Sequence, residues 1–210
     1  MSGIVLADAE SQDDLKRYAT IVRTADADAG IRLVASGPVL AAYVCVVPGR
    51  GITGGGTVLG LRTFAVEPGE DVDVVVPAAA VLDRIAYGRA HHPDRYEIPV
   101  PPMSLFEPWA AQSPPRSGWE PAGELDAEDL IREVRAGITE LGEAGTGLAA
   151  QVDALRARVW GEPLTGWHAP RGLAFAAYRL RFLTPGEPAR LFRSGPWWRL
   201  RTAAGHALAR

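Results

Sequence analysis

The chain has 210 residues, of which 47% are hydrophobic and 22% charged, and its formal net charge is −3. These values are typical of a globular protein and exclude wholesale disorder, and the length allows one domain or two small ones with a sizeable core. No apolar run approaches the ~20 residues that span a bilayer, and the N-terminal residues lack the basic start of a signal peptide. The single cysteine, Cys45, lies in an apolar run, so we expect a buried thiol, no internal disulfide and a cytoplasmic protein.

The first part of the chain predicts a helix followed by antiparallel strands. The S-Q-D-D sequence beginning at Ser11 is a capping box, and apolar residues at helical spacing follow it, so we expect a helix over 12–24. Apolar runs bounded by turn residues then predict strands, and Pro77 is suited to the first turn of a second helix. The strands are expected over 31–35, 39–47, 57–66 and 71–76, and the second helix over 78–87.

A glycine-rich stretch, V-V-P-G-R-G-I-T-G-G-G-T-V-L-G, lies between two of these strands. Gly49, Gly51 and Gly54 have the G-x-G-x-x-G spacing of a dinucleotide-binding turn. That turn requires a helix after it, because the helix N-terminus holds the pyrophosphate, whereas T-V-L-G-L-R-T-F predicts a strand. We therefore interpret the stretch as a hairpin loop, and leave open that Gly49–Gly56 form a flap over a ligand or another subunit.

A proline-rich segment follows the second helix. Eight prolines between residues 92 and 121 exclude a long helix or a central strand. The same segment contains Phe106, Trp109 and Trp119, which a polar linker would lack. We therefore expect a packed, extended strap over 93–124 with its aromatic side chains buried beneath it.

The last part of the chain predicts three helices and a β-hairpin. Asp126 is the expected cap of a helix over 127–141, Thr146 caps a second helix, and a third, apolar nearly all round from Leu173 to Leu183, starts at Pro170. The closing runs A-R-L-F-R-S-G-P-W-W-R-L-R-T and H-A-L-A-R predict a strand hairpin. We detect no internal repeat in the sequence.

Together these elements predict an α+β protein with an antiparallel sheet. Residues 1–92 form a lobe in which helices flank the sheet, 93–124 form the strap, and 125–210 form a C-terminal helical lobe closed by the β-hairpin. Whether this hairpin joins the first sheet stays open.

The charges are distributed unevenly along the chain. From Thr165 to the end there are eight arginines and one acid, Glu187, whereas 1–164 carry 24 acids and 14 basic residues. The arginines are expected to pair with the acidic helix over 126–143 or with an acidic partner chain. Three helices and a hairpin are also the order of a DNA-binding winged helix, but the third helix is apolar where a recognition helix is polar. Nucleic acid is therefore an alternative that the sequence does not favour.

No catalytic, cofactor-binding or metal-binding residue can be assigned. Neither G-x-S-x-G nor Ser-x-x-Lys occurs, and although His91 and His92 lie near Asp94 and Glu97, neighbouring side chains point apart. We interpret the histidines as a polar helix C-terminus. Adjacent strand tryptophans face opposite sides of a sheet, so one of a pair is a candidate for an interface. The candidate interface or ligand contacts are Trp197, Trp198, Arg193, Arg199, Trp109, Trp119 and His168.

Two resemblances accompany these predictions. The order of elements over 11–88, with the motif D-V-V-V-P-A-A-A-V-L-D-R-I-A, is similar to half a domain of a DNA sliding clamp, which implies a topology of helix, antiparallel strands and helix. The segments S-P-P-R-S-G-W-E-P and W-W-R-L-R-T-A-A-G-H-A-L-A-R look like those of uncharacterised proteins from GC-rich bacteria. The second resemblance implies no activity and no catalytic residue.

The sequence thus predicts a non-enzymatic interaction protein that uses its Arg/Trp-rich C-terminus. Its expected partner is a second copy of itself or an acidic protein surface, with no membrane and no cofactor. One alternative is a small-molecule binder or enzyme whose pocket lies between the lobes and is lined by Trp109, Trp119 and His168. The other is a nucleic-acid binder that uses the C-terminal arginines.

Overall fold

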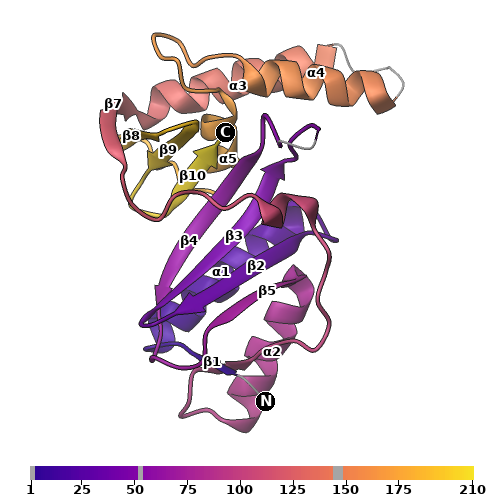
Figure 1. Cartoon of the computed structure of the whole chain (residues 1–210), viewed down its shortest axis with the longest axis vertical. Helices are drawn as coiled ribbons and strands as arrows, with labels where there is room; N and C mark the ends of the chain where they lie inside the picture. Colours follow the sequence, from indigo (N-terminus) through magenta and orange to yellow (C-terminus); the bar gives the residue numbers. More distant parts are fainter. Residues whose placement is uncertain (1–2, 52–53, 144–148) are drawn as a thin grey trace. The chain divides into compact units, whose positions relative to one another are not determined.

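The computed structural model describes residues 3–51, 54–143 and 149–210, and the chain divides into two compact units (Figure 1). The first unit contains Met1–Cys45 and Leu61–Ala111, and the second contains Val46–Gly60 and Gln112–Arg210. Eight strands form an open antiparallel sheet in the order β5-β2-β3-β4-β10-β9-β8-β7. The predicted α+β class is confirmed, and the C-terminal strand β10 does lie beside β4.

The first unit is built from a helix, antiparallel strands and a second helix. Its elements are β1 (Gly3–Val5), α1 (Ala9–Ala25), β2 (Gly30–Ser36), β3 (Val39–Val47), β4 (Val58–Ala65), β5 (Val72–Pro77), α2 (Ala78–His91), β6 (Glu97–Pro99) and the 3-10 helix η1 (Pro108–Ala111), with the ends of β3 and β4 continuing into the second unit. Apolar side chains on one face of the strands, such as Leu33 and Leu40, are fully buried, and α1 lies behind this face (Figure 1).

Helix α1 begins one turn earlier than the sequence predicts. The Ser11 N–H donates to the Asp8 carboxylate at 2.7 Å, so Asp8 is the N-cap and Ser11 lies inside the helix. The prediction of Ser11 as the cap was wrong because two acceptors suited to capping stand three residues apart, and the earlier one is used.

The second unit carries the remaining helices and strands. Its elements are β7 (Glu120–Asp126), α3 (Ala127–Glu143), α4 (Ala149–Gly161), α5 (Gly172–Arg179), β8 (Pro188–Ser194), β9 (Trp197–Arg201) and β10 (His206–Ala209). The Asp126 carboxylate accepts the Glu128 N–H at 2.7 Å, which confirms the predicted cap of α3, whereas Thr146 lies outside the described residues. Helix α5 is shorter than predicted, because Arg181 has a φ of 58° and turns the chain out of the helix.

The glycine-rich stretch is part of the β3–β4 hairpin. Arg50 and Gly55 form an antiparallel bridge, and Gly54 and Gly56 have positive φ values of 62° and 79°. Strand β4 follows the glycines, so the helix N-terminus that a dinucleotide-binding turn uses to hold a pyrophosphate does not follow this stretch. The interpretation as a hairpin loop is confirmed, and whether Gly49–Gly56 act as a flap stays open.

The strap does not bury all its aromatic side chains. Trp109 and Trp119 are half-buried, but Phe106 is 95% exposed, so the prediction for Phe106 was wrong. The Leu105 N–H donates to the Val75 carbonyl at 2.8 Å, which holds Leu105 at the edge of β5 and leaves the next side chain pointing away. The strap's last residues begin β7, where Pro121 is tolerated because β7 is an edge strand.

An internal repeat that the sequence analysis missed relates the two parts of the sheet. The motif R-L-x-x-S-G-P occurs at 32–38 and at 190–196, at the β2–β3 and β8–β9 hairpins. In each hairpin a Gly-Pro pair joins the strands, and the glycines, Gly37 and Gly195, have φ values of 57° and 53°. A glycine of positive φ at the first central position is typical of a type II′ hairpin turn.

The repeat extends to the strand and helix beside each hairpin. In both β5–α2 and β7–α3 an edge strand passes directly into a helix, and the two helices bury the same stripe of positions. These positions are Ala78, Val81, Ile85 and Gly88 in α2 and Ala127, Leu130, Val134 and Gly137 in α3. The repeat is hidden in the sequence because strand and helix follow the hairpin in the first copy and precede it in the second.

Candidate functional site

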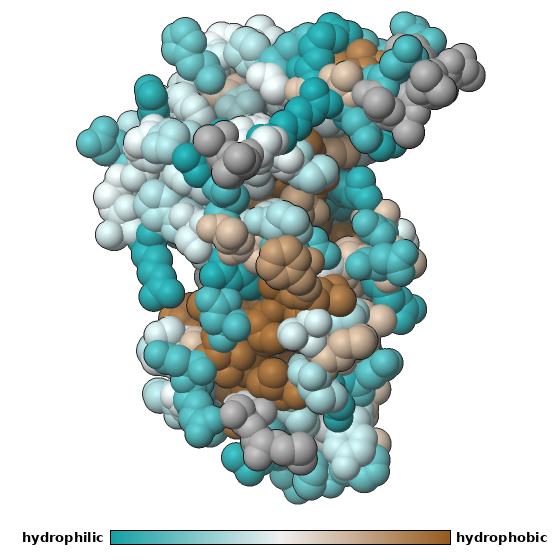
Figure 2. Space-filling view, turned by 45° about the vertical axis from the view of Figure 1, so that its right-hand side comes forward, coloured by the Kyte–Doolittle hydropathy of each residue, from teal (hydrophilic) through white to brown (hydrophobic). Residues whose placement is uncertain are grey.

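The two copies of the hairpin share an inner face and differ on the outer face. Facing the helices, Leu33 and Leu191 occupy the same register position, and both are buried. On the outer face, the first copy has Val34 opposite Ala41, where the second has Phe192 opposite Arg199. In Figure 2 hydrophobic residues gather on the surface of the first unit, whereas the surface of the second unit in this view is largely hydrophilic. The fold therefore accepts an apolar outer face at this hairpin, so the needs of the fold do not explain why Arg199 stands in the second copy.

Arg199 is the centre of this outer face. Its guanidinium carbon lies 4.6 Å from the ring centroid of Trp119 and 4.6 Å from that of Phe192. The Trp119 ring is held by its indole N–H, which donates to the Pro115 carbonyl at 2.9 Å. The Arg199 Nε is buried without a hydrogen-bond partner, and burial followed by the charge of Arg201 lowers the pKa of Arg199. A cation is thus held between two aromatic faces with donor capacity unused.

His206 and Arg201 extend the same face. Arg201 lies two residues after Arg199 on β9, and His206 is its cross-strand partner on β10. Burial, and then the charges of Arg199 and Arg201, lower the pKa of His206 to about 4, so its imidazole is neutral at pH 7. Its Nδ1 is also buried without a hydrogen-bond partner. Among the described residues neither Arg199 nor Arg201 forms an ion pair.

Two of the arginines in the C-terminal part of the chain form ion pairs with acids of the same chain. Arg171 is only 17% exposed and contacts the carboxylates of Glu133, Glu162 and Glu140 at 3.3, 3.2 and 3.9 Å, so the predicted pairing with the acidic helix is confirmed for this arginine. Arg190 pairs with Glu124 of β7 at 3.3 Å.

Arg32, at the same place in the first copy of the hairpin, pairs with Asp73 of β5 at 2.8 Å. An arginine at the start of R-L-x-x-S-G-P therefore ties each hairpin to its edge strand. Arg199 has no counterpart of this kind, because the first copy has Ala41 there.

The structure brings some of the predicted contact residues together and separates others. Arg199 meets Trp119, and Arg193 lies 5.3 Å from the ring centroid of Trp198. Of the tryptophan pair, Trp197 is buried at 5% exposure and Trp198 is half-buried on the face of Leu200. The remaining two are placed elsewhere: Trp109 is half-buried in η1 of the first unit, and His168 is exposed in the loop before α5.

Sequence reasoning missed Phe192, Arg201 and His206. The signal was present, since Arg199 and Arg201 alternate along a predicted strand and must share a face. Their aromatic and imidazole neighbours come from other strands, and only the pairing register reveals them.

The remaining candidate chemistry has structural explanations. His91 stacks on Tyr87 with ring centroids 4.1 Å apart at the end of α2, in agreement with a polar helix C-terminus. Within residues 3–51, 54–143 and 149–210, no three His, Cys, Asp or Glu side chains are grouped to hold a metal ion. Cys45 is half-buried rather than buried as predicted, because it alternates onto the less buried face of β3. Burial, followed by the charge of Glu107, raises the pKa of its thiol to about 12. None of the described helices is long and apolar enough to cross a membrane.

The fold is that of bacterial DNA sliding clamps. The chain is similar to Caulobacter crescentus pol III beta (13% identity, TM-score 0.54, 100% of this chain and 65% of the other). It is likewise similar to the Caulobacter crescentus DNA polymerase sliding clamp, with 15% identity and a TM-score of 0.53 over 100% of this chain and 65% of the clamp. The Pseudomonas aeruginosa sliding clamp bound to griselimycin is similar with 13% identity and a TM-score of 0.50 over 100% of this chain and 64% of the clamp. The chain spans less than two thirds of the length of these clamps. The resemblance that the sequence shows over 11–88 is confirmed at the level of the fold and extends along the whole chain.

Residues 1–109 match the family model described as a domain of unknown function (DUF8010), and the chain belongs to this family. Residues 114–210 match a second model, also a domain of unknown function (DUF8185). A search of curated proteins finds no match. The two matched segments meet where the strap passes from one compact unit to the other.

Proposed function

We propose that the chain is a non-enzymatic protein-interaction module that binds an acidic segment of a partner protein on the outer face of β8, β9 and β10. The observation that carries the proposal is Arg199, which is held between Trp119 and Phe192 with its Nε buried and unpaired. Leaving a buried charged donor without a partner costs free energy, so we infer that this guanidinium has a role outside folding, as the contact for a carboxylate of a partner.

The internal repeat supports a binding role for this arginine. A residue required for folding the hairpin would be expected in both copies, as the paired arginines Arg32 and Arg190 are. Ala41 occupies the position of Arg199 in the first copy, and Tyr43 that of Arg201. The hairpin therefore folds without these two cations.

The chemistry of the face suits carboxylates. Two guanidinium groups offer planar pairs of donors, and hydrogen bonds between ionised partners are the strong ones. Trp119 and Phe192 provide apolar area next to the charges, a combination enriched in protein interfaces. His206 is neutral at pH 7 and adds no charge. A nucleic-acid interface of ~6–10 phosphate contacts would require more cations than Arg199 and Arg201 supply.

The test compares two arginines that carry equal charge. A fluorescein-labelled octaglutamate peptide is titrated with the protein at low salt, and its anisotropy gives the affinity. Arg199→Gln is expected to weaken binding about tenfold, because a hydrogen bond to a charged group contributes roughly 1.5 kcal/mol or more. Arg190→Gln serves as the control, since Arg190 is already paired with Glu124.

Three outcomes would contradict the proposal. The peptide could fail to bind, both variants could lose the same affinity, or a 20-base DNA strand could bind at least tenfold more tightly than the peptide. Equal losses would mean that only total charge matters, and tight DNA binding would favour the nucleic-acid alternative.

Self-association is a second candidate, favoured by the acidic surface of α3. Exposed carboxylates of this helix include Glu128 and Glu143, which could meet Arg199 of a second copy. The edge of β7 is less suited to pairing, because Pro121, Glu120 and the other acids of that strand discourage added strands. Sedimentation equilibrium at about 100 μM would show a salt-sensitive dimer that Arg199→Glu dissociates; a monomer at low salt would rule this candidate out.

A further inference from the structure

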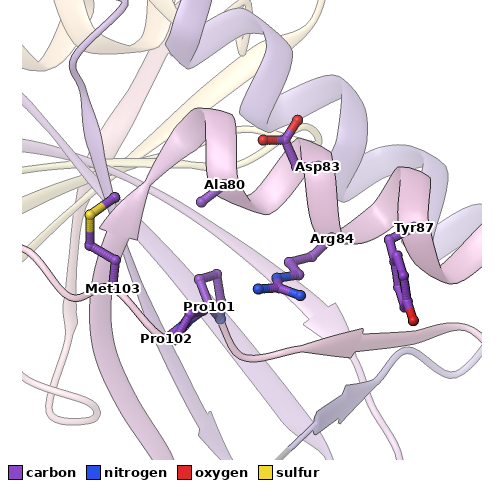
Figure 3. Close-up of a pocket in the computed structure, with 7 residues that line it drawn as sticks. All are labelled: Ala80, Asp83, Arg84, Tyr87, Pro101, Pro102 and Met103. Atoms are coloured by element: carbon purple, nitrogen blue, oxygen red, sulfur yellow. The ribbon is translucent and has the colours of Figure 1, made fainter.

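A pocket of about 360 Å³ lies in the first unit, on the side of α2 that the strap passes (Figure 3). Ala80, Asp83, Arg84 and Tyr87 line it from the helix, and 101–103, the run Pro-Pro-Met, line it from the strap. This volume lies within the ~300–1,000 Å³ that is usual for small-molecule sites.

The pocket lies over a second stripe of α2, which mixes apolar and charged residues. Ala80, Arg84 and Tyr87 recur at helical spacing, and they lie beside the stripe that α2 buries against the core. The two large side chains at the mouth remain exposed, with Tyr87 at 47% and Met103 at 58%. Tyr87 is held in place by its stack on His91. Exposed aromatic and thioether groups around a concave surface are typical of a binding site.

Arg84 supplies the polar group of the pocket. Its guanidinium lies between Pro101 and Tyr87 and points into the pocket (Figure 3). No ion pair joins Arg84 to an acid among the described residues, whereas Arg89 of the same helix pairs with Asp13 at 2.6 Å. The pocket thus combines apolar walls with one cation that has no acidic partner.

We propose that this pocket binds a small amphipathic carboxylate. Its aliphatic or aromatic body would lie on Tyr87, Met103 and the two prolines, and its carboxylate would accept hydrogen bonds from the Arg84 guanidinium. A doubly charged phosphate is disfavoured, because Arg84 is the one cation among the lining residues and Asp83 adds a negative charge. The site goes beyond the proposed protein interaction, and the two share no residue.

The test uses the sequence's two methionines. Met1 and Met103 give two signals in a protein labelled with ¹³C at the methionine methyl groups, and the Met103 signal is assigned with Met103→Leu. Titration with octanoate is expected to shift the Met103 signal saturably and leave Met1 unchanged. Octanamide, which has the same body without the charge, and octyl phosphate are the comparison ligands.

Arg84→Gln is expected to weaken octanoate binding about tenfold. Octanamide is expected to bind the unaltered protein about tenfold more weakly than octanoate does. Arg23→Gln removes an equal charge from α1 and should have no effect. The proposal would be overturned if octanoate caused no saturable shift, if Arg84→Gln bound octanoate as well as the unaltered protein, or if octyl phosphate bound more tightly than octanoate. Failure here would leave the octaglutamate result unaffected, because that site lies in the second unit.

Discussion

Replacing Arg199 by leucine should stabilise the protein while abolishing binding of the acidic peptide. The unpaired, buried Nε costs ~1–3 kcal/mol, which the substitution removes. Against this, two cation–π contacts of ~0.5–1 kcal/mol each are lost, although leucine still fills the space between Trp119 and Phe192. The expected balance is a gain of roughly 0.5 kcal/mol, which raises the Tm of a chain of this size by ~1–2 °C.

The assay is thermal unfolding followed by circular dichroism at pH 7, with peptide binding measured on the same samples. Arg190→Leu is the control, because it removes an arginine that is paired with Glu124, and it is expected to leave stability unchanged or slightly lower. A fall in Tm of more than about 3 °C for Arg199→Leu would refute the reasoning. It would mean that the cation–π contacts stabilise the fold and that Arg199 has a structural role.

Three further predictions follow from buried groups. The pKa of His206 is about 4 in the folded protein, below the usual 6.5, so the unfolded state binds more protons between these two pH values. The free energy of unfolding should therefore fall as the pH is lowered from 6.5 to 4. In urea unfolding, His206→Asn should flatten this pH dependence. Cys45 is half-buried and its thiol pKa is raised to about 12, so it should react with Ellman's reagent at pH 8 much more slowly in the native protein than after unfolding, and equal rates would contradict this. In α3, a Cβ on Gly137 would lie 2.8 Å from the Trp160 ring, so Gly137→Ala should cost ~1–3 kcal/mol by chemical denaturation. Gly142→Ala, which meets no atom within 4 Å, should stabilise by up to ~1 kcal/mol, and equal effects would show that close packing at Gly137 is unimportant.

The sequence predicted most strands and helices because their patterns are local. The runs 31–35 and 39–47 and the S-G-P turn between them match β2 and β3 closely, since apolar content and a turn glycine are sufficient signals. Helix α5 was predicted too long because an arginine with positive φ, Arg181, has no sequence signature. The exposure of Phe106 depends on a hydrogen bond between distant residues, which the sequence does not show.

The candidate site could be predicted only in part for a similar reason. Arg199 and Trp119 were recognisable as unusual residues, but nothing in the sequence places one over the other. Their contact requires β7, β8 and β9 to be neighbours, and that order follows from the whole sheet. The lowered pKa of His206 likewise depends first on its burial in the folded sheet, and then on the charges of Arg199 and Arg201.

The internal repeat shows which features the two hairpins share and which they do not. Both copies of the hairpin keep a buried leucine, a Gly-Pro turn and an arginine tied to the edge strand, so these features meet needs that the two share. The outer face is where the copies differ, with Ala41 and Tyr43 in one and Arg199 and Arg201 in the other. Since an unpaired buried donor weakens a fold that an alanine would satisfy, its presence in one copy alone favours the proposed role outside folding. A partner carboxylate that pairs with the Arg199 guanidinium would provide that benefit, which is why stability and binding should change in opposite directions at this position.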